Sequence, residues 1–208
     1  MQQLNTQSFQ YEFNLSDVIP HAHVYEEATR IQAETYITDV IYESFVVTAD
    51  QDYLTARLLA LKGLPRGFFW GASQATEKYL KAFLLLKGIS VKELSNSHQI
   101  LKIYDHAQAI DARLSTVDTE PHPSIKNTTG STAALQKFKV RKLLTEIDTH
   151  GAARNRYNAA GLDYNTGHLL AFDTFVHQLR SLLGVPDISE SYKRLSHDLT
   201  DSFHLANP

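Results

Sequence analysis

Basic side chains gather in one stretch of the chain, between residues 137 and 156. Six of the chain's twenty lysines and arginines fall within these twenty positions, opposed only by Glu146 and Asp148. They are Lys137, Lys139, Arg141, Lys142, Arg154 and Arg156. The whole chain carries a formal net charge of -3 at pH 7, so this positive excess is local. A local excess of cations favours a partner that carries phosphate groups.

These basic residues form two groups. At helical spacing the four between 137 and 142 spread around the helix axis, which is typical of a solvated helix surface. The run Arg154-Asn155-Arg156-Tyr157 lies instead beside a glycine-containing loop. Arginine stays charged at all physiological pH values and can neutralise a phosphate. These four residues are therefore our candidate residues for binding a nucleotide or RNA.

A second polar group interrupts an otherwise apolar helix that we expect over residues 68–87. Its members fall within one arc of roughly 100° around the helix. They are Gln74, Glu77, Lys78 and Lys81. Three interpretations stay open: a structural stripe with an i,i+4 ion pair, the edge of the binding cleft, or a two-fold interface that includes Trp70. In the second interpretation Glu77 orients an arginine and a lysine contacts phosphate.

The composition excludes several classes of site. No cysteine is present, which rules out disulfides, thiolate zinc sites and cysteine nucleophiles. The histidines imply no metal-ligand set, and no glycine-rich phosphate loop, Ser-His-Asp arrangement or paired carboxylates are found. We therefore expect neither a metal nor a cofactor. Without a signal-peptide pattern or an apolar run of about 18 residues, the sequence predicts a soluble, cytoplasmic protein without membrane contact.

The first half of the chain reads mostly as helix. Residues 22–47 are ambiguous, because their second half is rich in β-branched and aromatic residues, and we favour a helix over a strand. The next helix begins at Asp50 or Asp52 as its N-cap and ends near Gly63. The leucines that recur there at helical spacing are Leu54, Leu58 and Leu61.

A turn over residues 64–67 leads into the helix over 68–87, where Gly88 is the expected C-terminal cap. The run Ser95-Asn96-Ser97 then offers N-caps for a helix over 98–114. Its inward residues are expected to be Ile100, Ile103, Tyr104 and Ala107.

Residues 115–131 contain two prolines and many small polar residues, and we expect a long exposed loop. A helix over 132–150 follows, and after a loop over 151–167 comes the helix with the plainest apolar stripe. The stripe is Leu169, Phe172, Val176, Leu179 and Leu183. Asp187 and Glu190 form a capping box for a last short helix. The sequence thus predicts an all-α fold with an N-terminal arm (1–46), a helical bundle (47–184) and a C-terminal helical extension (185–208).

Four elements of the bundle, in their order, resemble the HEPN family (higher eukaryotes and prokaryotes nucleotide-binding domain). The most specific is the string Gln74-Ala75-Thr76-Glu77-Lys78-Tyr79-Leu80-Lys81-Ala82, a full match to the family form Q-A-x-E-K-x-L-K-A. The others are YLTARLLAL, the histidine at residue 98 that starts a helix, and the arginine-rich string before the last bundle helix. The resemblance implies about five core helices and a homodimer. It also implies RNA cleavage, RNA or nucleotide binding, or partnership with a small nucleotidyltransferase.

The catalytic motif of the family is incomplete in this chain. The RNA-cleaving members of the family share an Arg-x(4–6)-His motif, often followed by x-Tyr. Here Arg156 is followed by Leu162 at the histidine position and then by Asp163 and Tyr164. Neither His150, which precedes both arginines, nor His168 has the required spacing.

The missing histidine matters because cleavage of RNA through its own 2′-OH needs proton transfer near neutral pH, to which imidazole is suited. Our leading hypothesis is a non-cleaving HEPN-like dimer that binds nucleotide or RNA phosphate through Arg154, Arg156 and the lysine edge, with Tyr164 nearby. One alternative is a ribonuclease toxin of a toxin-antitoxin pair, in which another residue replaces the histidine and a nucleotidyltransferase is the partner. The other is a structural protein-interaction module with a nucleotidyltransferase-like partner.

Overall fold

Helices form all regular elements of the residues that the computed structural model describes, which confirms the all-α class. The described residues are 27–91, 99–115, 140–151, 164, 166–185 and 188. Several expected features lie outside these residues. They are the arm before residue 27, the caps at 95–97 with His98, the loop at 116–131, the helix start at 132–139, the run Arg154-Asn155-Arg156-Tyr157 with Leu162, and the last short helix.

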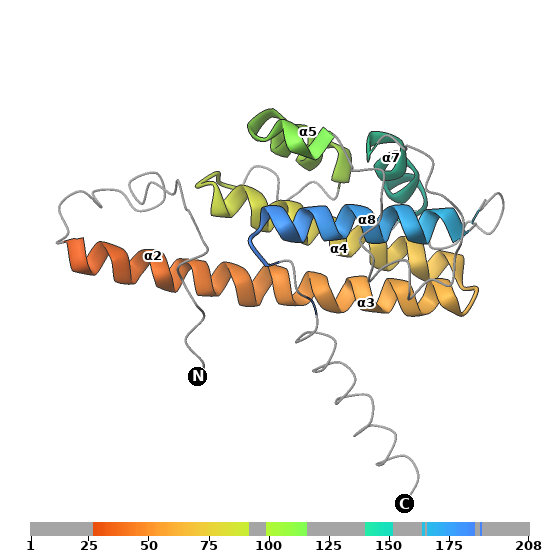
Figure 1. Ribbon diagram of the computed structural model, residues 1–208, viewed down its shortest axis with the longest axis horizontal. Helices are drawn as coiled ribbons and strands as arrows, with labels where there is room; N and C mark the ends of the chain where they lie inside the picture. The colour runs from red at the N-terminus through yellow and green to blue at the C-terminus, as the bar shows by residue number, and fades with distance from the viewer. Residues whose placement is uncertain are drawn as a thin grey trace, which may run out of the picture.

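One nearly continuous helix runs from residue 27 to residue 61 and forms the base of the molecule in Figure 1. It comprises α2 (Glu27–Ile41), the π-helical turn η3 (Tyr42–Val47) and α3 (Thr48–Leu61). The expectation of a helix instead of a strand in this region is confirmed. The intrinsic preference of β-branched and aromatic residues for strands is weak, and packing overrides it. The boundary expected at residue 46 falls inside this helix.

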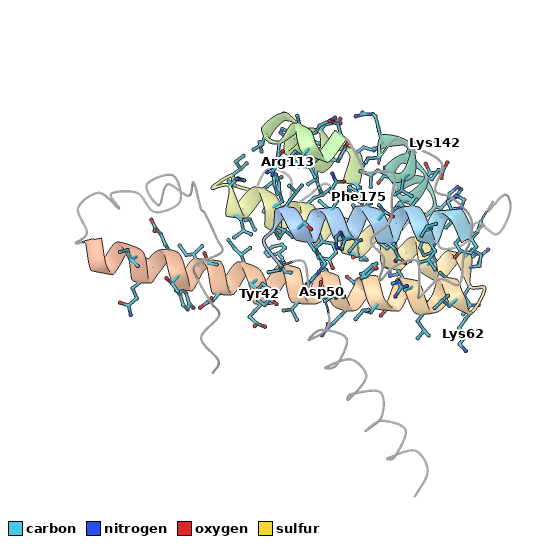
Figure 2. The ribbon with its side chains drawn as sticks, in the orientation of Figure 1. Tyr42, Asp50, Lys62, Arg113, Lys142 and Phe175 are labelled. Atoms are coloured by element: carbon cyan, nitrogen blue, oxygen red, sulfur yellow. The ribbon has the colours of Figure 1, made fainter. Side chains whose placement is uncertain are left out.

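The N-cap expected at Asp50 or Asp52 is wrong. Val47, the residue before α3, already has helical torsion angles (φ -61°, ψ -42°) and makes no side-chain cap bond. Asp50 is 0% exposed and lies between α3 and α8 (Figure 2). An aspartate near a helix start can either cap the helix or make a contact with another element. Here Asp50 makes a tertiary contact.

Two of the three leucines that recur at helical spacing on α3 are exposed. Leu54 is buried, but Leu58 and Leu61 are 48% and 58% exposed. The inward side of α3 carries Ala56, and a Cβ added to Gly71 of the neighbouring helix would lie 3.0 Å from the Ala56 Cβ. Small residues let the two helix backbones approach closely, so the buried side is the alanine side of α3.

The central helix is α4 (Pro65–Leu86), which packs against α3, α5, α7 and α8. It starts three residues earlier than expected, because a proline at the first helical position needs no hydrogen-bonded N–H. It ends as expected at Gly88, which has φ 73°. The Ile89 N–H donates to the Leu84 carbonyl and the Gly88 N–H to the Leu85 carbonyl, both at 2.9 Å, in a Schellman motif.

The remaining elements cover the other sides of α4 (Figure 1). They are α5 (Ile100–Ile110), the short 3-10 helix η4 (Ala112–Ser115), α7 (Val140–Gly151) and α8 (Thr166–Leu182). The inward residues predicted for α5 are buried, and so are those of the apolar stripe of α8, including Leu183 just beyond its end. Ile100, the first residue of α5, donates its N–H to Asp148 Oδ1 on α7 at 3.3 Å.

Two buried charge clusters join α3 to α8. In the first, Arg180 and the Tyr79 hydroxyl of α4 both donate to Asp50 Oδ1. In the second, Asp173 Oδ1 accepts from the Tyr53 hydroxyl at 2.8 Å, and Arg57 Nε lies 2.9 Å from the same oxygen. Each carboxylate therefore has an arginine and a tyrosine as partners.

The two clusters are reciprocal and fix how α3 and α8 align. Asp50 and Arg57 of α3 lie seven residues apart, and so do Asp173 and Arg180 of α8, with the aspartate first in both helices. The contacts run antiparallel, since the earlier residue of α3 meets the later residue of α8. A slip of about two turns would set the two aspartates or the two arginines against each other. Like charges in the interior are very unfavourable, so the clusters specify one register.

Candidate functional site

The arginine-rich run belongs to residues 152–163, whose two flanking residues are attached to the start of α4. At one end Gly151 packs so tightly that an added Cβ would lie 2.3 Å from the Phe69 carbonyl oxygen and 2.6 Å from the Ser73 Cβ. At the other end the Tyr164 ring centroid lies 5.2 Å from that of Phe68 and 6.3 Å from that of Phe69. The segment with Arg154 and Arg156 therefore starts and finishes on the same turns of α4.

An aromatic–histidine cluster, consisting of Phe69, His150, Tyr164 and His168, occupies this end of the bundle. The Phe69 ring lies 5.0 Å from His150 and 5.8 Å from His168, centroid to centroid. Tyr164 stacks on His168 at 5.8 Å with 24° between the ring planes. The structure thus brings the two histidines that motif spacing set aside into contact with one phenylalanine.

A carboxylate also contacts the cluster. Glu146 Oε2 of α7 lies 3.1 Å from His168 Nε2 of α8, and the two side chains are 33% and 13% exposed. Such a contact fixes the orientation of an imidazole. The spacing gave a partial signal for this arrangement: Glu146 precedes His150 by four residues on α7, so these two side chains lie on one helical face.

Tyr164 serves as a hydrogen-bond donor at neutral pH and not as a base. Burial, with a smaller contribution from the Asp173 carboxylate, raises the pKa of its hydroxyl above the ordinary value near 10. The hydroxyl therefore stays protonated throughout the physiological range.

Helix ends of both signs and two exposed cations lie around the cluster. The contacts of Phe68 and Phe69 with Tyr164 and His168 bring the N-termini of α4 and α8 to the same end of the molecule (Figure 1). Their partial positive charges are offset by the C-termini of α3 at Leu61 and of α7 at Gly151. The exposed side chains of Lys62 and Arg66 add full positive charges.

The polar stripe of α4 is largely buried. Lys81 Nζ lies 2.6 Å from Glu77 Oε1, and the residues are 9% and 7% exposed. Lys78 reaches across to Asp52 Oδ2 of α3 at 2.5 Å, and Gln74 is half-buried. The expected i,i+4 pair between Glu77 and Lys81 is present, inside the protein instead of on its surface.

The members of the stripe differ in how close they lie to the flanks of the arginine-rich run. Gly151 contacts α4 at Phe69 and Ser73. Glu77 follows Ser73 by four residues, a rotation of about 40° around the helix axis, whereas Lys78 is rotated by about 140°. A role of the stripe at the edge of the cleft therefore stays a prediction. Trp70 is 36% exposed, and its role in a dimer stays a prediction.

The described part of the chain contains neither a candidate metal site nor a candidate membrane-spanning helix. No group of three His, Asp or Glu side chains among the described residues could hold a metal ion. None of the described helices is both long and apolar enough to cross a membrane. Comparison of the chain with protein-family models, with curated proteins and with solved structures finds no match.

Proposed function

We propose that the chain is a non-cleaving, HEPN-like module that binds the phosphate of a nucleotide or of RNA through Arg154 and Arg156, with Asn155 and Tyr157 beside them. The observation that carries this proposal is the attachment of both ends of their segment to α4. Gly151 and Tyr164 both contact Phe69. A segment held at both ends loses less conformational freedom on binding than a free tail does.

The local electrostatics support the same ligand chemistry. The exposed cations Lys62 and Arg66 lie at this end, and no aspartate or glutamate occurs from residue 53 to residue 76. A phosphate gains from both cations. Base or ribose rings could stack on the aromatic–histidine cluster, as nucleotides do on aromatic side chains elsewhere.

The proposal that the module does not cleave RNA depends on the absence of a group that could transfer a proton near neutral pH. Leu162 stands where the family motif has histidine, arginine cannot act as a base, and the raised pKa of Tyr164 keeps its hydroxyl protonated. On this account the site holds its ligand without reacting with it. We further propose that the module acts as a homodimer.

RNA cleavage is the second candidate function, because of one observation. His150 and His168 both contact Phe69, and Glu146 contacts His168. An imidazole oriented by a carboxylate is a suitable general base or acid. In this alternative a histidine from the helices flanking the arginine-rich run replaces the missing motif histidine.

Thermal unfolding with ATP as the probe tests the binding proposal. ATP should stabilise the folded protein by mass action and so raise its melting temperature. When the ATP concentration is 100 times Kd, the gain in unfolding free energy is about 2.7 kcal/mol. Added salt should weaken the effect. The Arg154→Ala, Arg156→Ala double variant should lose the shift, whereas the matched control Arg141→Ala, Lys142→Ala, on the exposed side of α7, should retain it. An unchanged shift in the first double variant would locate the site elsewhere.

A further inference from the structure

The long helix over residues 27–61 separates its charges by sign. No lysine or arginine occurs from residue 31 to residue 56, and the exposed Asp39 and Glu43 make this half acidic. No aspartate or glutamate occurs from residue 53 to residue 76, and Lys62 and Arg66 are exposed at this end. One helix therefore has an acidic end and a basic end.

Large apolar side chains are exposed at both ends. On the acidic half Tyr36 is 70% exposed and Val40 is 43% exposed. At the basic end Leu58, Leu61 and Leu64 are 48%, 58% and 53% exposed. Exposed apolar residues that gather in this way, with charged residues beside them, are typical of interaction surfaces.

These residues lie where the other described helices leave the long helix uncovered. Figure 1 shows α4 and α8 along one side of α3, with α2 projecting beyond them, and Lys62 lies at the opposite end from α2 (Figure 2). Val40 and Leu58 are 18 residues apart in the sequence, or about 27 Å along a helix. We call the surface formed by Tyr36, Asp39, Val40, Leu58, Leu61 and Lys62 the outer helix surface.

We propose that the outer helix surface binds the same surface of a second copy of the chain, with the two long helices antiparallel. This arrangement puts the acidic, apolar half of each helix against the basic, apolar end of the other. A two-fold axis repeats every contact, so Val40 meets Leu58 twice and Asp39 approaches Lys62 twice. A parallel pair would instead set Asp39 and Glu43 against their own copies.

This inference rests on the homodimer part of the proposed function and names its surface. It differs from the interface expected at Trp70, because Trp70 belongs to α4 and the outer helix surface belongs to α2 and α3. Of the groups assigned to phosphate binding it uses only Lys62, and the Arg154→Ala, Arg156→Ala variant leaves Lys62 in place. The ATP-induced thermal shift can therefore be absent while the dimer forms, and the dimer can be absent while the thermal shift is present.

Sedimentation velocity over a range of protein concentrations tests the surface. The wild type should be a dimer at tens of micromolar, and Leu58→Glu should raise the dimer Kd by about tenfold or more, because a carboxylate would be buried without a partner. Ile110→Glu is the matched control, since Ile110 is 41% exposed on α5 and distant in sequence from the long helix. Circular dichroism should show that both variants keep the helical fold.

A charge exchange tests the antiparallel arrangement itself. Asp39→Lys and Lys62→Glu should each weaken the dimer, and the double variant should recover most of the lost affinity, because the charge pair is restored with its signs reversed. Failure of the double variant to recover would overturn the arrangement. Dissociation by Trp70→Glu but not by Leu58→Glu would move the interface to α4. A wild type that stays monomeric would overturn the inference and the homodimer together.

Discussion

Two groups of polar side chains in this bundle look alike in composition and differ in how they meet solvent. In the middle, Asp50 and Asp173 are 0% exposed, and each has an arginine and a tyrosine as hydrogen-bonding partners. At the end near α7, Glu146 and His168 are also paired, but their side chains are 33% and 13% exposed. Both groups include polar contacts between helices, yet only the second can reach a ligand without unfolding the core.

This difference decides which group we assign to function. A buried charge is tolerated only when it is fully paired, and its partners are then committed to the fold. The reciprocal pairs between α3 and α8 satisfy this condition and specify the helix register. In the aromatic–histidine cluster Phe69 is fully buried, but His150, Tyr164 and His168 are half-buried and flank the arginine-rich run, so these three side chains can exchange water for a ligand at small cost.

The largest effect expected from this comparison concerns stability. Asp50→Ala should lower the free energy of unfolding by roughly 3–5 kcal/mol, because it leaves the Arg180 charge buried without its carboxylate. Glu146→Ala, which removes a partly exposed pair, should cost less than about 1 kcal/mol. Urea unfolding of both variants measures the two losses of unfolding free energy. Similar costs for the two substitutions would show that the middle and the end of the bundle do not differ in kind.

The next effect is a pH dependence that belongs to the middle of the bundle. Burial raises the pKa of Asp173 to about 6, against the opposing influence of Arg57 and Tyr53. The value in an unfolded chain is about 3.9. The folded protein therefore binds the proton more tightly, and the stability gained from protonation is complete below about pH 4 and lost as the pH rises through about 6.

The Asp173→Asn variant isolates this contribution. Between pH 4 and pH 7 the difference in unfolding free energy between wild type and variant should change by roughly 2–3 kcal/mol, with the wild type favoured at the lower pH. Urea unfolding at several pH values measures it. Parallel pH profiles for the two proteins would mean that Asp173 titrates in the folded state as it does in an unfolded chain.

The smallest effect concerns the attachment of α7 to α4. In Gly151→Ala the added Cβ would meet the Phe69 carbonyl oxygen at 2.3 Å, and backbone cannot move aside cheaply. We expect a loss of about 1–3 kcal/mol in stability and a weaker ATP-induced shift. Gly67→Ala is the matched control, because its Cβ would meet the flexible end of the Leu59 side chain at 2.6 Å. Equal behaviour of the two variants would contradict the proposed anchoring.

Much of the fold could be predicted from the sequence where local rules decide it. The stripe of α8 and the glycine end of α4 follow from helical periodicity and from the freedom of glycine to take positive φ. The charge clusters could not be predicted in this way. Asp50 looked like a helix cap, since its partner Arg180 is 130 residues away in the sequence and only the tertiary structure joins them.

The candidate site shows the same limit. The local excess of basic residues identified Arg154 and Arg156 without a structure. His150 and His168 were set aside because a linear motif measures spacing along the chain, and the packing of α7 and α8 on Phe69 brings them together regardless of spacing. A search for titratable residues four apart on expected helices would have found His150, through Glu146, but not His168.

A single sample of labelled single-stranded RNA tests the central claim most directly. Fluorescence anisotropy with purified wild type, followed by a denaturing gel of the same mixture after several hours, measures binding and integrity together. The account predicts saturable binding that weakens with salt and is lost in Arg154→Ala, Arg156→Ala, with the RNA intact throughout. Cleavage by the wild type that disappears in His168→Ala or His150→Ala would contradict it and assign the proton transfer to the aromatic–histidine cluster.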